Sequence, residues 1–297
     1  MPEIRKPRAG SLQFWPRKRA RQGYPKLNNF PDINENKLVG FAGYKVGMTH
    51  IMAIEKNKNS PNRGQEIAVP VTILETPSLK IASVRFYKKD PNLKVKKEIR
   101  VNVGKDLARK LIPSKNKKDP KKELEKIELD NYDEIRVLVY TQPKLTSIGK
   151  KKPELFELAI GGNLEDKFNY VKEKIDKEIL IQDIFKSGDY VDLHAITKGK
   201  GFQGPVKRFG ISIRQHKSEK AIRNPGSLGP WYGHAHFMWR VQKKKKMGYH
   251  QRTEYNKQIM MISDEIEKVS QEGGFLKYGK LKNPYIMIKG SVPGPKK

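Results

Sequence analysis

Runs of apolar residues with the character of β-strands recur along most of the chain. They are short, rich in Val, Ile and aromatic residues, and separated by clusters of Gly, Pro, Asn and Ser. Such runs are typical of strands joined by turns. The predicted strands are residues 40–55, 67–75, 81–87, 98–103, 135–140, 179–181, 190–197, 259–262 and 285–288. The chain is therefore predicted to be mainly β.

One segment has helical spacing instead. Its apolar positions recur every three or four residues and so fall on one face of a helix: Leu164, Phe168, Val171 and Ile175. Asn163 precedes them as a suitable N-cap, and Glu165 and Asp166 suit the positive end of the helix dipole. We therefore predict a helix over residues 164–176.

Charge is distributed unevenly. The net charge is +30, from 62 Lys and Arg against 32 Asp and Glu. Residues 1–26 hold eight bases and one acid, residues 198–257 hold 15 Lys and Arg and two acids, and residues 119–192 hold 17 acids and 13 bases. Nucleic acid is the partner that fits best, because each basic group that neutralises a phosphate releases a counterion. We expect the middle region to be a folded insert that faces water or protein.

The two basic segments lack the apolar residues that a core needs. Residues 1–26, rich in Pro and Gly, are expected to be disordered alone and to order on RNA. Residues 198–257 combine Gly and Pro with aromatic residues, and an irregular stretch of this length is usually functional. Aromatic residues beside basic ones are typical of RNA binding. We therefore predict an arm, residues 197–256, that embeds in structured RNA.

Several classes of protein are excluded. The sequence has no cysteine, which rules out disulfides, thiolate catalysis and cysteine-ligated zinc. No apolar run approaches the roughly 20 residues of a membrane helix. Proline and glycine break any amphipathic helix near the N-terminus, so a transit peptide is not expected. We expect a cytosolic protein that does not associate with membranes.

Residues 199–204 (GKGFQG) match the G-x-G-x-x-G dinucleotide pattern and follow a predicted strand. The pattern binds a dinucleotide only when a helix begins at its third glycine. Here Pro205 follows at once, and no apolar helical stripe is present. We therefore expect a glycine-rich bend that lets the backbone approach RNA while neighbouring bases meet phosphates: Lys198, Lys200, Lys207 and Arg208. The alternative is an RNA-modifying enzyme with a nucleotide cofactor at Gly199–Gly204.

His216, His234 and His236 could be metal ligands or a general base. Zinc takes three or four ligands, and no Cys, Asp or Glu near His234 and His236 completes a set. We favour hydrogen bonds to RNA or backbone. Trp231 lies among Gly and Pro, so we favour stacking on an unpaired base, worth about 1–3 kcal/mol, over packing on its own loop. No nucleophile elbow, paired carboxylates or P-loop is present, so no catalytic residue, cofactor or metal is expected.

Several separated motifs relate the chain to a known family. They are residues 7–12 and 14–20 (PRAGSL and FWPRKRA), 40–49 (GFAGYKVGMT), 197–210 (TKGKGFQGPVKRFG), 231–239 (WYGHAHFMW), 248–256 (GYHQRTEYN) and 292–297 (VPGPKK). In this order they resemble the large-subunit ribosomal protein L-three family in its archaeal and eukaryotic form. Family members commonly continue past the last motif with another basic segment.

The resemblance implies a translation-protein-type β-barrel with an α+β insert and long basic N-terminal and central finger extensions. The implied boundaries are 1–36 for the N-terminal extension, 37–75, 179–204 and 258–297 for the barrel and its basic C-terminus, 76–178 for the insert, and 205–257 for the finger. Trp231 is expected at the finger tip near the peptidyl-transferase centre, with His216 on the neighbouring limb.

The resemblance also implies the function. Large-subunit rRNA and neighbouring large-subunit proteins are the expected partners, in the cytoplasmic ribosome and without a free homo-oligomer. The chain would support early subunit assembly and shape the surroundings of the peptidyl-transferase centre without being an enzyme. The expected rRNA-binding residues are Arg8, Arg17, Lys18, Arg19, Arg21, Lys198, Lys200, Lys207, Arg208, Arg214, His216, Lys217, Arg223, Trp231, His234, His236, Arg240 and Arg252.

Overall fold

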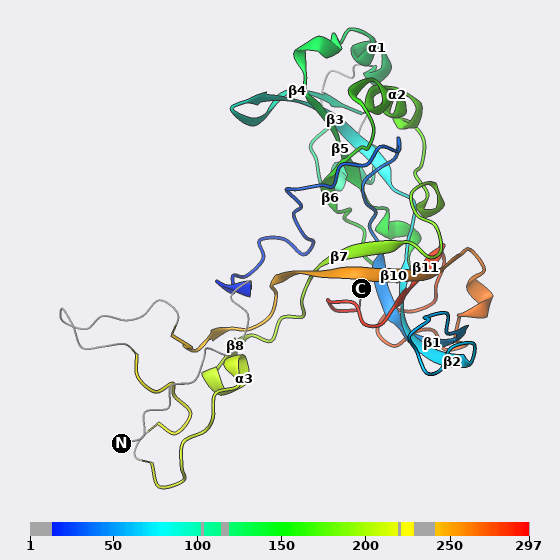
Figure 1. Cartoon of the computed structure of the whole chain (residues 1–297). Coiled ribbons are helices and arrows are strands. Elements are labelled where there is room, and N and C mark those ends of the chain that lie inside the picture. Colours follow the sequence, from blue (N-terminus) through cyan, green and yellow to red (C-terminus); the bar gives the residue numbers. More distant parts are fainter. Residues whose placement is uncertain (1–13, 102–103, 114–118, 219–220, 229–240, 297) are drawn as a thin grey trace, which may run out of the picture. The chain divides into compact units, whose positions relative to one another are not determined.

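The computed structural model describes residues 14–101, 104–113, 119–218, 221–228 and 241–296, and its ribbon is drawn in Figure 1. The chain divides into two compact units. The first, which we call the body, consists of Lys26–Leu193 with Glu254–Lys297. The second, the extension unit, consists of Met1–Pro25 with His194–Thr253. The basic N-terminal segment and the basic arm, far apart in sequence, therefore belong to one unit.

A five-stranded sheet forms one part of the body. Its strand order is β1 (Tyr44–Ile54), β2 (Glu66–Glu75), β11 (Tyr285–Lys289), β10 (Gln251–Ser263) and β7 (Tyr190–Ile196). The pairs β1–β2, β2–β11 and β11–β10 are antiparallel. Apolar side chains of these strands are buried against a C-terminal loop: Val46, Val71, Ile73, Tyr285 and Met287 with Phe275 and Tyr278. Among the described residues no pairing joins β1 to β7, so closure into a barrel remains an implication of the family resemblance.

A four-stranded antiparallel sheet forms the other part of the body. Its order is β4 (Asn92–Arg100), β3 (Lys80–Asp90), β5 (Glu134–Tyr140) and β6 (Leu155–Ala159). Helices α1 (Pro120–Glu125) and α2 (Leu164–Lys174) contribute Leu124 and Phe168 to the core of this sheet. Short 3-10 turns are η2 (Leu107–Arg109), η3 (Leu129–Asn131), η4 (Pro143–Leu145), η5 (Ile181–Asp183) and η6 (Ile266–Lys268).

The described part of the extension unit has little regular structure. It contains the two-residue strands β8 (Phe202–Gln203) and β9 (Lys245–Lys246) and the short helix α3 (Pro205–Phe209). We call the segments that carry them, residues 197–210 and 243–252, the finger base.

The mainly β fold is confirmed, and most predicted elements lie where the pattern placed them. The helix is confirmed as α2, with Asn163 at its N-cap, where the Asn163 backbone N–H donates to the Asp166 carboxylate at 3.4 Å. Predicted strands coincide with β1, β2, β3, β5, β7 and β11. The strand predicted over residues 259–262 lies within β10, which begins earlier, at Gln251, and so includes residues 251–256 that were expected to belong to the irregular arm.

Three predictions about strands are wrong. The strand expected over residues 98–103 is displaced, because β4 begins at Asn92 and its first six residues are all exposed, including the alternating Leu93 and Val95. The prediction missed β6 (Leu155–Ala159), although Leu155, Phe156 and Leu158 are apolar and the strand ends in buried residues. The strand expected over residues 179–181 is a single bridge between Leu79 and Ile179, after which the chain turns into η5.

Candidate nucleic-acid interface

The finger base is a narrow antiparallel ribbon. The backbone N–H of Thr197 donates to the carbonyl of His250 at 2.9 Å, and that of Lys200 donates to the carbonyl of Met247 at 2.9 Å. Beyond these bonds, β8 pairs antiparallel with β9. The ribbon holds the two limbs of the arm together where the arm begins.

Glycine is required at one point of this ribbon. Gly248 has a φ of +74°, a conformation that L side chains rarely adopt. A Cβ at this position would lie 2.1 Å from the carbonyl oxygen of Lys198. The close approach of the two limbs therefore depends on the absence of a side chain at position 248.

The glycine-rich segment Gly199–Gly204 is followed by a helix, which corrects the sequence-based expectation of a bend alone. Gly204 is extended at the N-cap, and Pro205 occupies the first helical position, where its missing N–H costs nothing. Gly210 ends the helix in the left-handed conformation. However, α3 has only five residues, and β8 belongs to an antiparallel pair rather than to a βαβ unit. The arrangement therefore does not support a dinucleotide site.

The N-terminal segment packs on the finger base through its backbone. Within residues 14–25, the N–H of Ala20 donates to the carbonyl of Tyr249 at 2.8 Å. The Nδ1–H of His250 donates to the carbonyl of Lys18 at 2.7 Å. This segment has few apolar residues, as the sequence indicates. Its backbone nevertheless forms hydrogen bonds with the finger base of the same chain, whereas the sequence predicted that it would order only on RNA.

Side chains strengthen the same contact. The ring of Trp15 stacks on that of Phe209, with centroids 5.3 Å apart and planes at 24°. The Nη1 of Arg17 donates to the carbonyl of Arg208 at 2.7 Å, and the Arg17 guanidinium lies 4.5 Å from the Phe209 ring centroid. Helix α3 is thus held to the N-terminal segment by an aromatic stack and a charged hydrogen bond.

Three arginines converge here without a counter-charge. Arg208 is buried, and its Nη1 donates to the carbonyl of Lys243 at 3.1 Å. Burial, and then the charge of Arg17, lowers the pKa of Arg208 and also that of Arg252. In the described part of the chain none of the three forms an ion pair with an acid. Repulsion of this kind is relieved when an anion binds.

His250 lies inside the same cluster as a neutral ring. Burial, and then the charges of Arg252, Arg208 and Arg17, lowers its pKa, although the bond to Lys18 opposes this. Because Nδ1 donates to a carbonyl, the neutral ring leaves Nε2 as an acceptor. Within the described structure, neither this Nε2 nor the Nε of Arg208 has a hydrogen-bond partner, and both atoms are buried.

The structure brings together some of the residues expected to bind rRNA and leaves others apart. The finger base and the segment packed on it carry Arg17, Lys18, Arg19, Lys198, Lys200, Lys207, Arg208 and Arg252. Arg21 is exposed on the same N-terminal segment. Arg214, His216, Lys217 and Arg223 are exposed in the loop after α3, where the N–H of Arg214 donates to the carbonyl of Ile222 at 3.1 Å. Arg8, Trp231, His234, His236 and Arg240 lie outside the described residues.

Sequence reasoning missed the residues that position these cations. Arg19 lies 5.3 Å from the ring centroid of Tyr249, and Arg252 lies 5.0 Å from that of Phe14. His250 and Trp15 were not singled out either. All of them fall in the motifs at residues 14–20 and 248–256, so the signal was the motif rather than any single residue type.

Comparison with known proteins identifies the family. The family model described as Ribosomal protein L3 matches residues 1–297. The chain is 47% identical over 300 residues to "Large ribosomal subunit protein uL3" of Methanothermobacter thermautotrophicus, 45% identical over 299 residues to that of Archaeoglobus fulgidus, and 43% identical over 301 residues to that of Methanocaldococcus jannaschii. These alignments cover 98%, 98% and 99% of this chain and 89% of each relative. No helix in the described ranges is long and apolar enough to span a membrane. The chain belongs to the ribosomal protein L3 family.

Proposed function

We propose that this chain is a structural protein of the large ribosomal subunit, in cytoplasmic ribosomes, and that its extension unit binds large-subunit rRNA. The observation that carries the proposal is the cluster of Arg17, Arg208 and Arg252, which no acid of the described chain neutralises. Family membership supports the same reading, because the relatives are named as large-subunit proteins. Neighbouring large-subunit proteins are its further partners.

The cluster suits phosphate groups in particular. Guanidinium groups present several N–H donors in one plane, which matches the oxygens of a phosphate. The guanidinium carbons of Arg17, Arg19 and Arg252 lie 4.5, 5.3 and 5.0 Å from the ring centroids of Phe209, Tyr249 and Phe14. Arg17 and Arg252 each also donate one hydrogen bond to a backbone carbonyl, which leaves further N–H donors on each group. Arginines held in this way lose less side-chain freedom when they bind. Lys198, Lys200 and Lys207 on the finger base add exposed charges for further phosphates.

We extend the proposal to the rest of the arm on the family resemblance. The finger, residues 205–257, reaches toward the peptidyl-transferase centre with Trp231 at its tip, and the chain supports early assembly of the subunit. The finger contacts RNA along its length through Arg214, His216, Lys217 and Arg223. The chain holds RNA in place, and the RNA performs the chemistry. No described feature favours an RNA-modifying enzyme.

Sedimentation tests the proposal. A tagged full-length chain, expressed in an archaeal host and followed through a sucrose gradient at physiological salt, is expected to migrate with large subunits and whole ribosomes. When magnesium is lowered to separate the subunits, the chain should follow the large subunit, and a small-subunit protein serves as control. Retention of the chain at the top of the gradient would contradict the proposal.

A further inference from the structure

A lysine-rich ribbon in the body has no part in the site described above. Strand β3 pairs with β5 only as far as Tyr87 opposite Glu134, whereas β3 continues to Asp90 and pairs there with β4 alone. The two strands therefore extend past the four-stranded sheet as a free ribbon, visible in Figure 1. We call residues 88–97 the β3–β4 ribbon.

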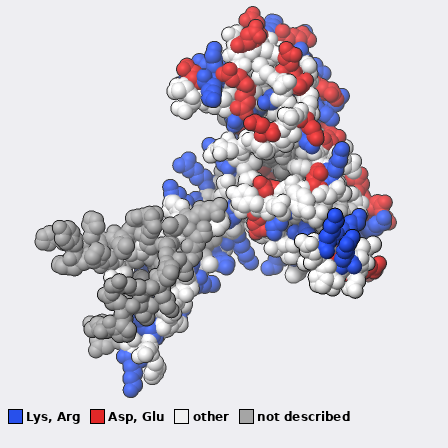
Figure 2. Space-filling view, in the orientation of Figure 1, with Lys and Arg blue, Asp and Glu red and all other residues white. Residues whose placement is uncertain are grey.

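The ribbon carries a high density of positive charge, which destabilises the pairing of its own two strands. Its lysines are all exposed: Lys88, Lys89, Lys94, Lys96 and Lys97. Lys88 lies directly opposite Lys94 in the strand register, and like charges in that position destabilise a strand pair. None of the five forms an ion pair among the described residues. Figure 2 shows blue side chains gathered over this ribbon and red ones over the neighbouring α1 and α2.

Protection of a sheet edge does not account for this pattern. Lysines on edge strands prevent pairing with another sheet, but a single lysine on each strand would be enough for that purpose. The only acid within the ribbon is Asp90, at its turn, and the next acid, Glu98, already binds Arg85 at 3.0 Å. The opposed lysines are explained by a polyanion that binds across both strands.

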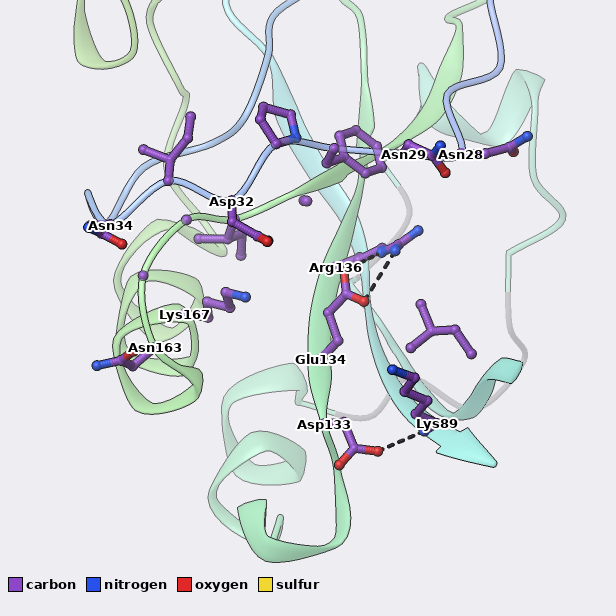
Figure 3. Close-up of a pocket in the computed structure, with 18 residues that line it drawn as sticks. Asn28, Asn29, Asp32, Asn34, Lys89, Asp133, Glu134, Arg136, Asn163 and Lys167 are labelled. Atoms are coloured by element: carbon purple, nitrogen blue, oxygen red, sulfur yellow. Dashed lines mark hydrogen bonds and ion pairs between the residues drawn. The ribbon is translucent and has the colours of Figure 1, made fainter. Parts of the chain in front are cut away.

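Strand alternation identifies the face that would bind. Lys88 and Lys94 share one face, and Lys89 lies opposite Leu93 on the other. That second face borders a hollow of about 620 Å³, shown in Figure 3, whose lining includes the acids Asp32, Asp133 and Glu134. Asp133 accepts the backbone N–H of Lys89 at 2.7 Å, and Glu134 accepts two bonds from Arg136 at 2.7 and 3.1 Å. Carboxylates make the hollow a poor phosphate site, so the face of Lys88 and Lys94 is favoured.

We propose that the β3–β4 ribbon is a second RNA-binding surface, whose lysines contact backbone phosphates of large-subunit RNA. The inference rests on the proposed function, which supplies the RNA, and adds a contact by the body to those of the extension unit. Lysines act on phosphates as point charges and need no fixed orientation, which suits a ribbon without buried polar anchors. The surface is therefore expected to bind RNA without reading its sequence.

The test compares two triple variants of the full-length chain that lose the same charge. One replaces ribbon lysines (Lys88→Gln, Lys94→Gln, Lys96→Gln). The other replaces exposed, ion-paired lysines elsewhere in the body (Lys121→Gln, Lys122→Gln, Lys177→Gln). Binding to deproteinised large-subunit RNA is measured against salt concentration. The ribbon variant is expected to bind at least about tenfold more weakly near physiological salt, with a salt slope smaller by about 2 to 3, while the control keeps the wild-type values.

Each result has a distinct meaning. Equal binding by the two variants, with the amide-exchange pattern of the wild type, would overturn the ribbon proposal and leave the proposed function intact. Unchanged RNA binding together with loss of a neighbouring acidic protein from purified subunits would assign the ribbon to a protein partner and also overturn it. Failure of the wild-type chain to bind the RNA would instead contradict the proposed function.

Discussion

We expect Gly248→Ala to open the finger base, with a loss of amide protection of more than about a hundredfold at Lys200 and Met247. Two costs combine. An L residue in the left-handed region costs roughly 1–2 kcal/mol. In addition, a Cβ placed 2.1 Å from the Lys198 carbonyl oxygen forces two backbones apart, an overpacking cost of roughly 1–3 kcal/mol or more. Since each 1.4 kcal/mol is about a tenfold change in an equilibrium, hydrogen exchange on the full chain should detect the sum.

Gly201→Ala is the matched control. Gly201 also has a positive φ, +70°, but nothing lies within 4 Å of the position of its Cβ. This variant should show only the conformational cost, a loss of protection of roughly tenfold. If both variants lose protection equally, a side chain at position 248 does not force the two limbs apart, which would contradict the prediction. Opening of the base by Gly248→Ala should also reduce incorporation of the chain into large subunits.

We expect Arg17→Ala to weaken binding to large-subunit RNA by about a hundredfold at physiological salt. The variant removes a charged hydrogen bond to the Arg208 carbonyl, worth roughly 1.5–3 kcal/mol. It also removes the contact with the Phe209 ring, worth roughly 0.5–1 kcal/mol. Loss of these contacts releases the N-terminal segment from α3, so Lys18 and Arg19 lose their placement as well. Binding of the full chain is measured by filter retention over a range of salt.

Arg21→Ala separates this effect from simple loss of charge. Arg21 is exposed on the same segment, so its replacement should cost one phosphate contact and lower the salt slope by about 1. Arg17→Ala should lower the slope by more than that. Equal affinities and slopes in the two variants would mean that Arg17 is only one more surface charge, and that the docking of the N-terminal segment does not contribute to RNA binding.

The strands that bury apolar side chains could be predicted from the sequence, because β2, β5 and β11 carry runs of Val, Ile and Leu or aromatic residues, and successive residues of these runs are buried. The lysine-rich start of β4 could not, since both of its faces are exposed and only pairing with β3 makes it a strand. Helix α3 was missed for a related reason. Its five residues carry no apolar stripe, and a proline at the first helical position resembles a helix breaker unless the N-cap is known.

The basic character of the candidate site could be predicted, but not its assembly. Charge counts single out the N-terminal segment and the arm separately. Nothing in either segment indicates that Trp15 stacks on Phe209 or that His250 binds the carbonyl of Lys18, because these contacts join positions far apart in the chain. The sequence motifs contain all of these residues, but a motif does not show which of its residues are in contact in the folded chain.

The central claim is that the N-terminal segment and the finger base bind rRNA as one unit. Electron cryomicroscopy of the large subunit that contains this chain tests it most directly. We expect residues 14–25 to lie on the finger base, with phosphate oxygens within about 3 Å of the guanidinium nitrogens of Arg17, Arg19 or Arg252. Guanidinium groups that face only protein or solvent, or an N-terminal segment bound to RNA away from the finger base, would contradict it.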